Sequence, residues 1–210
     1  MNEVKLNRFD NRDEWLKFRV GFIGGSDASC VLDKNPFKSK EQFELEFKNK
    51  EYMPKEDTEA MAYGRDAEAL IRRLWELENK KKYTMLYFEN STITNSDYPF
   101  AIYSADGMIS EKKSERNGIW ECKTTFAKNK DELDRWEGQI PNNYYIQLLH
   151  GLMVTEFDFA ILTVKIKYYD KSIKQNIHII KDYLIERSDV EEDIEYLRKE
   201  EISFVDKNLK

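Results

Sequence analysis

Residues 118–124 read Gly-Ile-Trp-Glu-Cys-Lys-Thr, a largely apolar run whose composition predicts a β-strand. Because side chains alternate between the two faces of a strand, Glu121 and Lys123 share one face. Trp120 and Cys122 take the other face, and Cys122 is expected in the core. The stretch therefore predicts a strand that presents one carboxylate and one lysine together.

A second carboxylate, Asp106, ends the strand-like run that begins Ala101-Ile102-Tyr103-Ser104, within a strand predicted over residues 100–109. Gly107 follows it, where the chain can bend toward Glu121. Two carboxylates on neighbouring strands can hold a hard divalent cation through their oxygens. Lys123 is placed to orient or activate water and to screen phosphate charge. These are the requirements of phosphodiester hydrolysis, so the pattern indicates that chemistry.

The Glu-x-Lys spacing alone carries no information, because it occurs five times in the chain. The pairs are Glu3/Lys5, Glu46/Lys48, Glu78/Lys80, Glu111/Lys113 and Glu121/Lys123. The first four lie in a tail, at predicted helix ends or in a charged loop, where solvated pairing is the ordinary explanation. Only the fifth lies in an apolar strand that follows an aspartate. The alternative interpretation of this fifth pair is a cross-strand ion pair at the surface.

Glu68 lies on a long helix predicted over residues 58–79. It shares one helical face with three other residues: Gly64, Ile71 and Trp75. A carboxylate within an apolar stripe is costly unless it is paired or linked to a metal. The alternative is that Glu68 pairs with Arg65 or Arg72 on the exposed surface, and the spacing alone favours this alternative.

A glycine-rich turn at residues 21–25 follows Arg19 and precedes a short helix that Ser26 or Asp27 could cap, through about Leu32. Backbone amides of such a turn suit an anion, and Arg19 can add a forked contact to phosphate. The alternative is a tight connection that needs small residues for steric reasons.

Gln147 lies on a largely apolar helix predicted over residues 142–155. It could hold a water or the lysine of the site, and it could equally be a satisfied polar group of the core, which the spacing favours. His150 on the same helix is expected to be a partly buried structural residue, because no nucleophile or base is placed beside it.

The bulk composition predicts one domain over residues 1–210, since 40% hydrophobic content can fill one sizeable core. No apolar run reaches the length of a membrane span, and the polar N-terminus is unlike a signal peptide. Two separated cysteines and two histidines exclude a structural zinc cluster and suggest a reducing cytoplasm. The net charge of −6 weighs against nucleic acid, although a local basic surface can coexist with it.

The remaining patterns predict a fold of the α+β or mixed α/β class. Strands are expected over residues 84–90, 157–168 and 176–186. Ser39 with Gln42 predicts a capping box that opens a helix to about Lys48, and Ser188 with Glu191 predicts a capped terminal helix. Loops are expected over residues 49–57, 111–117 and 128–137.

The order of these motifs resembles the YqaJ-like viral recombinase family, which includes phage lambda exonuclease and belongs to the PD-(D/E)xK nuclease superfamily. The matching pieces span residues 15–155. They are Trp15-x-x-x-Arg19-x-Gly21-x-Ile23-Gly24-Gly25-Ser26-Asp27-Ala28, Asn35-Pro36-Phe37, Tyr63-Gly64-Arg65-Asp66-Ala67-Glu68, Ser104-Ala105-Asp106-Gly107, Glu121-Cys122-Lys123-Thr124, and Tyr144-Tyr145-Ile146-Gln147 leading to Met153-Val154-Thr155.

The resemblance implies a central mixed sheet flanked by helices, the core of a restriction endonuclease. It implies Mg²⁺, replaceable by Mn²⁺, at Asp106 and Glu121 with the backbone carbonyl of Cys122. Glu68 and Gln147 would complete the catalytic centre.

It also implies that Arg19 and Ser26 receive the 5′-phosphate of a double-stranded DNA end. Family members digest one strand from the 5′ end and hand the 3′ overhang to a single-strand annealing protein.

Several members form ring-shaped trimers, so the resemblance implies a homo-oligomer, with a trimer expected. It also implies a protein without membrane attachment in the cytoplasm of a bacterial host, encoded by a phage or prophage. Lys128, Lys130 and Arg135 are candidates for positive charge in the channel of such a ring, or simply solubilise a loop. This chain departs from the family in its short length and in the long, charged loop between Asp106 and Glu121.

Two other classes of protein fit the same fold. A structure-specific or Cas4-like endonuclease is the first, although Cas4 relatives usually carry a cysteine cluster for iron–sulfur and this chain has two isolated cysteines. A non-catalytic DNA-end-binding or inhibitory protein is the second. The presence of Asp106, Glu121, Lys123 and Glu68 argues against it.

Overall fold

The computed structural model of the chain describes residues 3–50 and 58–208. Within these ranges the strands form a five-stranded and a four-stranded sheet, and each sheet mixes parallel and antiparallel neighbours. The larger sheet has the order β3 (Tyr83–Leu86), β6 (Gly107–Glu111), β7 (Asn117–Ala127), β8 (Phe159–Asp170) and β9 (Gln175–Glu186). The smaller sheet has the order β1 (Val4–Arg8), β4 (Ser91–Asn95), β5 (Ala101–Tyr103) and β2 (Ile23–Gly24).

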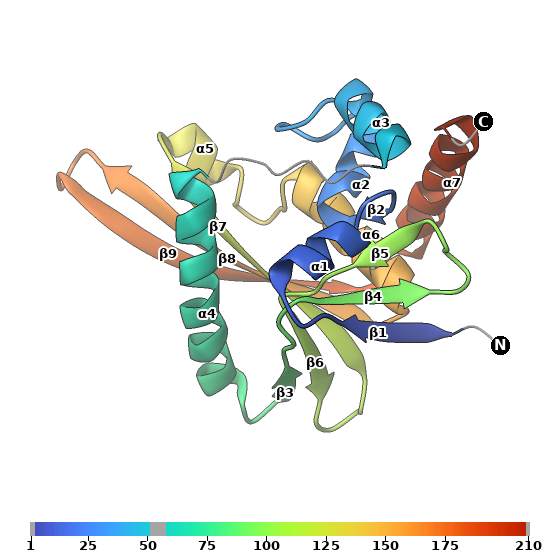
Figure 1. Ribbon diagram of the computed structural model, residues 1–210. Coiled ribbons are helices and arrows are strands. Elements are labelled where there is room, and N and C mark those ends of the chain that lie inside the picture. Colours follow the sequence, from blue (N-terminus) through green and yellow to red (C-terminus); the bar gives the residue numbers. More distant parts are fainter. Residues whose placement is uncertain (1–2, 51–57, 209–210) are drawn as a thin grey trace.

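Helices flank both sheets (Figure 1). They are α1 (Arg12–Phe18), α2 (Gly25–Val31), α3 (Lys40–Asn49), α4 (Glu59–Asn79), α5 (Lys130–Asp134), α6 (Asn142–Thr155) and α7 (Glu191–Asn208). The parallel strands β7 and β8 are connected through α5 and α6, and their other neighbours in the sheet are antiparallel. The expected class, a mixed sheet flanked by helices, is confirmed, with a second, smaller mixed sheet added to it.

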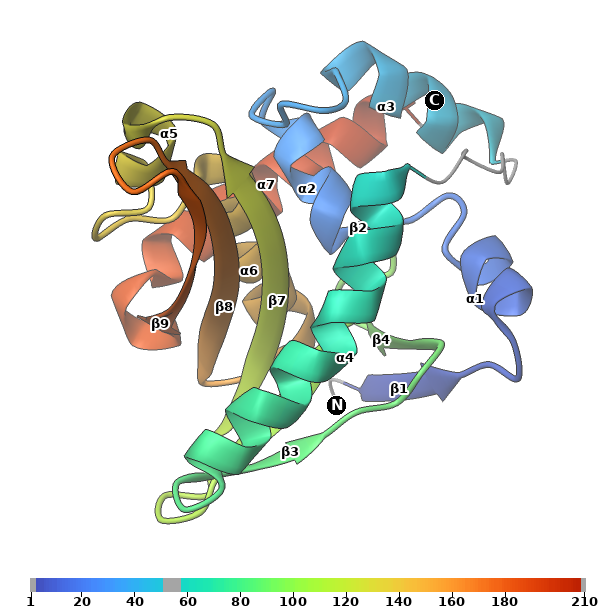
Figure 2. The ribbon, with the colours of Figure 1, turned by 90° about the vertical axis from the view of Figure 1, so that its left-hand side faces the viewer.

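Helices cover part of each face of the larger sheet. On one face α4 contributes Ile71 and Trp75 to a cluster with Trp120 and Phe159, and Figure 2 shows this helix crossing in front of β7. On the other face lies the main core, centred on α6.

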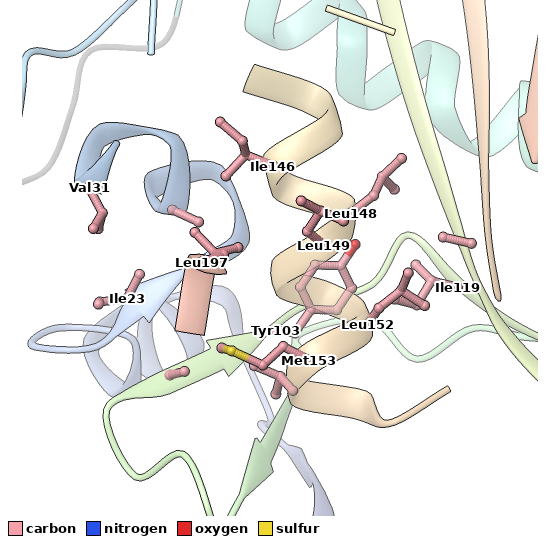
Figure 3. Packing of buried hydrophobic residues seen from close by; sticks show 14 of the residues in the cluster. Ile23, Val31, Tyr103, Ile119, Ile146, Leu148, Leu149, Leu152, Met153 and Leu197 are labelled. Carbon is pink, nitrogen blue, oxygen red and sulfur yellow. The ribbon is translucent and has the colours of Figure 1, made fainter. Parts of the chain in front are cut away.

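Figure 3 shows how the apolar side chains of α6 converge with those of α2, β5, β7 and α7. Leu152 and Met153 are fully buried at its centre, close to Tyr103. This core holds the two sheets together and fixes α6 against β7.

Local signals account for most helix starts. The Ser39/Gln42 capping box is present as expected, and the Thr58 side chain accepts a hydrogen bond from the Met61 amide to begin α4. Of the loop expected over residues 49–57, Asn49 ends α3 and residues 51–57 lie outside the described residues. In the part of the chain that is described, no helix is long and apolar enough to cross a membrane.

The prediction of a single strand over residues 100–109 is wrong. The segment forms β5 and β6, which belong to different sheets, and Asp106 lies in the connection between them. The break occurs because the Asp106 side chain accepts a hydrogen bond from the Cys122 backbone and so turns the chain toward β7.

Other boundaries also differ from expectation. The strand expected over residues 84–90 is shorter, because Asn90 adopts a left-handed conformation that turns the chain into β4. The predicted loop 128–137 contains α5, which Asn129 caps. The predicted cap at Ser188 is wrong, since this residue lies in a 3-10 turn (Arg187–Asp189) before α7.

Candidate active site

The site forms where β7 loses one of its neighbours. β6 pairs with β7 only as far as Trp120, opposite Gly107, whereas β8 follows β7 to Ala127. From Glu121 onward, one edge of β7 therefore has no paired strand among the described residues. Asp106, directly before β6, lies at this edge, and its Oδ2 accepts a hydrogen bond of 2.9 Å from the Cys122 amide.

Glu121 is held by three side chains. Its Oε1 accepts a hydrogen bond of 2.6 Å from the Tyr103 hydroxyl, and its Oε2 accepts bonds from Gln147 Nε2 at 2.8 Å and Lys123 Nζ at 2.9 Å. The residue is only 1% exposed. A carboxylate so deeply buried requires this number of donors if it is to remain ionised.

Lys123 links the two carboxylates. Its Nζ lies 3.9 Å from Asp106 Oδ2, besides the contact with Glu121. Burial alone would favour the neutral amine, but the charges of Glu121 and Asp106 raise the pKa of Lys123 above its ordinary value. Lys123 is therefore a fixed ammonium, suited to screening negative charge and unsuited to accepting a proton.

Negative charge is in excess at the site. Burial and the charge of Asp106 raise the pKa of Glu121 to about 7, against the opposing effects of Lys123 and Tyr103. The same two causes raise the pKa of Glu68 to about 7. The raised pKa values indicate a cluster in which an additional cation would be stabilised.

The oxygen donors fit a hard divalent cation. A residue in a strand directs its N–H and C=O to the same side. The Cys122 amide donates to Asp106 at the open edge of β7, so the Cys122 carbonyl points to this edge as well. Within residues 3–50 and 58–208, no three Asp, Glu, His or Cys side chains are grouped as a metal site. The donor set expected for a metal here, two carboxylates and one main-chain oxygen, needs no third side chain.

Glu68 forms an ion pair of 2.9 Å with Arg72, one of the two partners that the alternative interpretation named. The pair lies at the site, however, and not on a separate exposed surface. Arg72 also donates to the Asp106 carbonyl at 3.0 Å, and its guanidinium lies 3.4 Å from the centre of the Tyr87 ring. This arrangement fixes Glu68 beside Asp106. The sequence offered no signal for Arg72 beyond its helical spacing.

Tyr103 is the residue that sequence reasoning missed. It is 1% exposed, and its ring packs between two helices, α2 and α6. A Cβ on Gly25 would approach the ring to 2.8 Å, and a Cβ on Gly151 would approach it to 2.6 Å, so both positions need glycine. Only the fold brings these three residues together, because they are far apart in the chain.

The glycine turn brings α2 beside the site. A Cβ on Gly25 would also lie 3.3 Å from Gln147 Cγ, so the start of α2 contacts the residue that holds Glu121. Ser26 is exposed there. Arg19 stacks on the Trp15 ring at 4.5 Å, and Trp15 in turn hydrogen-bonds β4, which fixes the arginine near this turn.

The other residues singled out from the sequence have structural surroundings. His150 is fully buried and bonds to Glu201 and to the Ile102 carbonyl, so it is structural, though more deeply buried than expected. Cys122 faces α4 in the core, as predicted. The three candidate channel cations, Lys128, Lys130 and Arg135, are exposed around α5.

Comparison with known proteins gives consistent matches. The sequence model of the YqaJ-like viral recombinase domain matches residues 14–158. The uncharacterized protein YqaJ of Bacillus subtilis is 32% identical over 176 residues, which is 81% of this chain and 52% of the relative. The chain thus spans about half the length of the curated relative it matches.

Two crystal structures share the fold. An alkaline exonuclease from Laribacter hongkongensis superposes with a TM-score of 0.68 at 16% identity, covering 94% of this chain and 92% of that chain. The same protein in complex with dAMP gives a TM-score of 0.61 at 14% identity, covering 94% of both chains. At these identities the likeness shows the fold alone.

Tyr103→Phe is expected to destabilise the protein in a pH-dependent way. The folded-state pKa of Glu121, about 7, lies above its ordinary value of 4.5, so the folded protein keeps Glu121 protonated between these pH values. The lost hydrogen bond to an ionised carboxylate should therefore cost about 1.5–3 kcal/mol at pH 8 and less at pH 5.5. Urea unfolding at both pH values measures this difference.

Tyr145→Phe is the matched control, because its hydroxyl donates to the exposed Asp193. This variant should lose less than about 1 kcal/mol at either pH. Equal losses at pH 5.5 and pH 8 in Tyr103→Phe would show that its hydroxyl does not stabilise an ionised Glu121.

Proposed function

Because this chain belongs to the family of YqaJ-like viral recombinase domains, we propose that it is a metal-dependent deoxyribonuclease that acts as an exonuclease on double-stranded DNA ends. The observation that carries the proposal is the cluster of Asp106, Glu121 and Lys123 at the open edge of β7. The likeness of fold to an alkaline exonuclease supports it. The nuclease domain would comprise residues 1–210.

Asp106, Glu121 and the Cys122 carbonyl would hold Mg²⁺, which Mn²⁺ can replace. Such an ion, when bound, polarises a phosphoryl oxygen and makes a bound water more acidic. Lys123, as an ammonium, stabilises the charge that develops on the phosphate. Gln147 keeps Glu121 in its orientation through the 2.8 Å hydrogen bond. Glu68, with a pKa of about 7, is suited to accept a proton from the attacking water.

Digestion would run from the 5′ end and leave a 3′ overhang for a single-strand annealing protein. The position of Arg19 and Ser26 beside Gly24 and Gly25 supports a role in holding a 5′-phosphate, since a Cβ on Gly24 would lie 3.4 Å from the Arg19 guanidinium. A ring-shaped trimer in a bacterial cytoplasm, encoded by a phage or prophage, completes the proposal. In that ring Lys128, Lys130 and Arg135 would supply channel charge.

We expect hydrolysis of a blunt, 5′-phosphorylated duplex in Mg²⁺ or Mn²⁺ and none in EDTA. Asp106→Asn and Glu121→Gln should each lower the rate by at least about 100-fold while leaving the fold intact, because each removes a charged oxygen ligand. Release of mononucleotides is measured by gel electrophoresis or acid solubility.

Glu78→Gln is the control, since Glu78 belongs to another Glu-x-Lys pair and is exposed at the end of α4. Wild-type rates in either site variant would rule out the metal site. Internal cuts in a circular duplex would favour the endonuclease alternative, and binding of ends without cleavage would favour the non-catalytic one.

Arg19→Ala is expected to slow attack on 5′-phosphorylated ends by at least about tenfold more than attack on 5′-hydroxyl ends, because a forked contact to phosphate is lost. The two substrates are compared under single-turnover conditions. Arg12→Ala is the control, since Arg12 also stacks on Trp15, at 5.4 Å. Equal slowing of Arg19→Ala on both substrates would assign Arg19 a structural role or a general contact to DNA.

A further inference from the structure

Beyond the site, the α4 face of the sheet carries Phe126, Lys165 and Lys167, and Tyr63 of α4 lies beside Lys165. By strand alternation Thr124 and Phe126 share the face of Cys122, and the register places them beside Lys165 and Lys167. α4 covers the other end of this face, where Ile71 and Trp75 pack. Figure 1 shows the β8–β9 hairpin extending past α4 and α5. We call the residues Tyr63, Thr124, Phe126, Lys165 and Lys167 the Phe126 surface.

The two aromatic rings of this surface lie outside the hydrophobic core. Tyr63 and Phe126 are each 49% exposed. Lys165 Nζ donates to the Tyr63 hydroxyl at 2.7 Å and lies 5.3 Å from the ring centre. Lys167 Nζ lies 5.9 Å from the centre of the Phe126 ring. Each exposed ring thus has an ammonium beside it.

The charge of this hairpin is opposite to that of the whole chain. The net charge of the chain is −6, yet residues 165–174 contain four lysines and one aspartate. That aspartate, Asp170, is engaged in the turn, where it accepts hydrogen bonds from Ser172. The hairpin therefore complements a polyanion, and an acidic protein can bind one through such a local surface.

The open edge of β7 connects this surface to the site. Because the Cys122 amide points to Asp106, the amides and carbonyls of Thr124 and Phe126, at alternate positions, point to the same edge. The five residue-to-residue steps of strand from Glu121 to Phe126 span about 17 Å. At about 3.4 Å per stacked nucleotide, this length accommodates roughly five nucleotides.

We propose that the Phe126 surface binds unpaired nucleotides of the DNA strand that enters or leaves the Glu121 site, an inference that rests on the proposed function. Exposed rings favour a single strand over a duplex, because only unpaired bases offer free faces for stacking. Phe126 and Tyr63 stack against bases, and Lys165 and Lys167 contact phosphates.

Fluorescence anisotropy in EDTA tests the proposal without cleavage. The probes are a fluorescein-labelled 12-nucleotide oligothymidylate and a labelled blunt duplex of equal length. Phe126→Leu keeps an apolar side chain and removes the ring, so it should weaken single-strand binding by at least about fivefold. Its binding to the duplex should change less than about twofold, since duplex bases do not reach the ring.

The lysines are tested by salt dependence. Lys165→Gln combined with Lys167→Gln should reduce the slope of log Kd against log salt by about 1.4 for the single strand, as two phosphate contacts are lost. Lys199→Gln combined with Lys207→Gln, on α7, makes the same change of charge and should leave the slope unchanged. Tyr196→Leu, which removes a ring that is 57% exposed on α7, is the control for Phe126→Leu.

Unchanged single-strand affinity in Phe126→Leu, equal weakening of both probes, or a change of oligomeric state in place of affinity would each overturn the proposal. Tyr63→Leu carries the ring test if Phe126→Leu fails to fold. Single-strand binding by a wild-type protein that cuts no DNA would contradict the proposed function and leave this surface standing. Cleavage by the wild type together with normal single-strand binding by Phe126→Leu would support the proposed function and overturn the role of this surface.

Discussion

An ionised carboxylate can be kept out of water only where its oxygens receive hydrogen bonds, and Glu121, 1% exposed, meets this condition through Tyr103, Gln147 and Lys123. Those donors come from β5, α6 and β7, so the requirement of one side chain ties three elements together. Close packing of α2 and α6 on the Tyr103 ring follows from it, as do the glycines at positions 25 and 151. Replacing any one donor would leave a buried charge partly unsatisfied.

Among the described residues, the crossing between the two sheets lies beside this carboxylate. The chain leaves β5 after Tyr103, passes through Asp106 and enters β6, and so it crosses from the smaller sheet to the larger one at the site. Asp106 and Arg72 stabilise this crossing through bonds to the Cys122 amide and the Asp106 carbonyl. Because β6 pairs with β7 only as far as Trp120, β7 has an open edge beside the carboxylates among the described residues.

The alternation of Glu121, Cys122 and Lys123 was predictable from sequence, because strand periodicity is local. The same holds for the Ser39 cap and for the buried stripe of α4. β1 and β4 were not predicted, since their short, polar sequences form strands through pairing with partners far away or outside the local sequence pattern, β1 with β4 and β4 also with β5. The role of Tyr103 could not be predicted from the sequence, because it depends on Glu121, eighteen positions later, and on two distant glycines. Helical spacing also could not decide whether Glu68 lies at the surface or at the site, because it would pair with Arg72 in either place.

Calorimetric titration with Mn²⁺ measures metal binding by the carboxylate pair without depending on cleavage. At pH 8 the wild type and Glu78→Gln should bind Mn²⁺ with equal affinity. Asp106→Asn and Glu121→Gln should each weaken binding by at least about tenfold, because each removes a charged oxygen ligand. Equal binding by all four proteins would contradict the assignment of the open edge of β7 as a metal site.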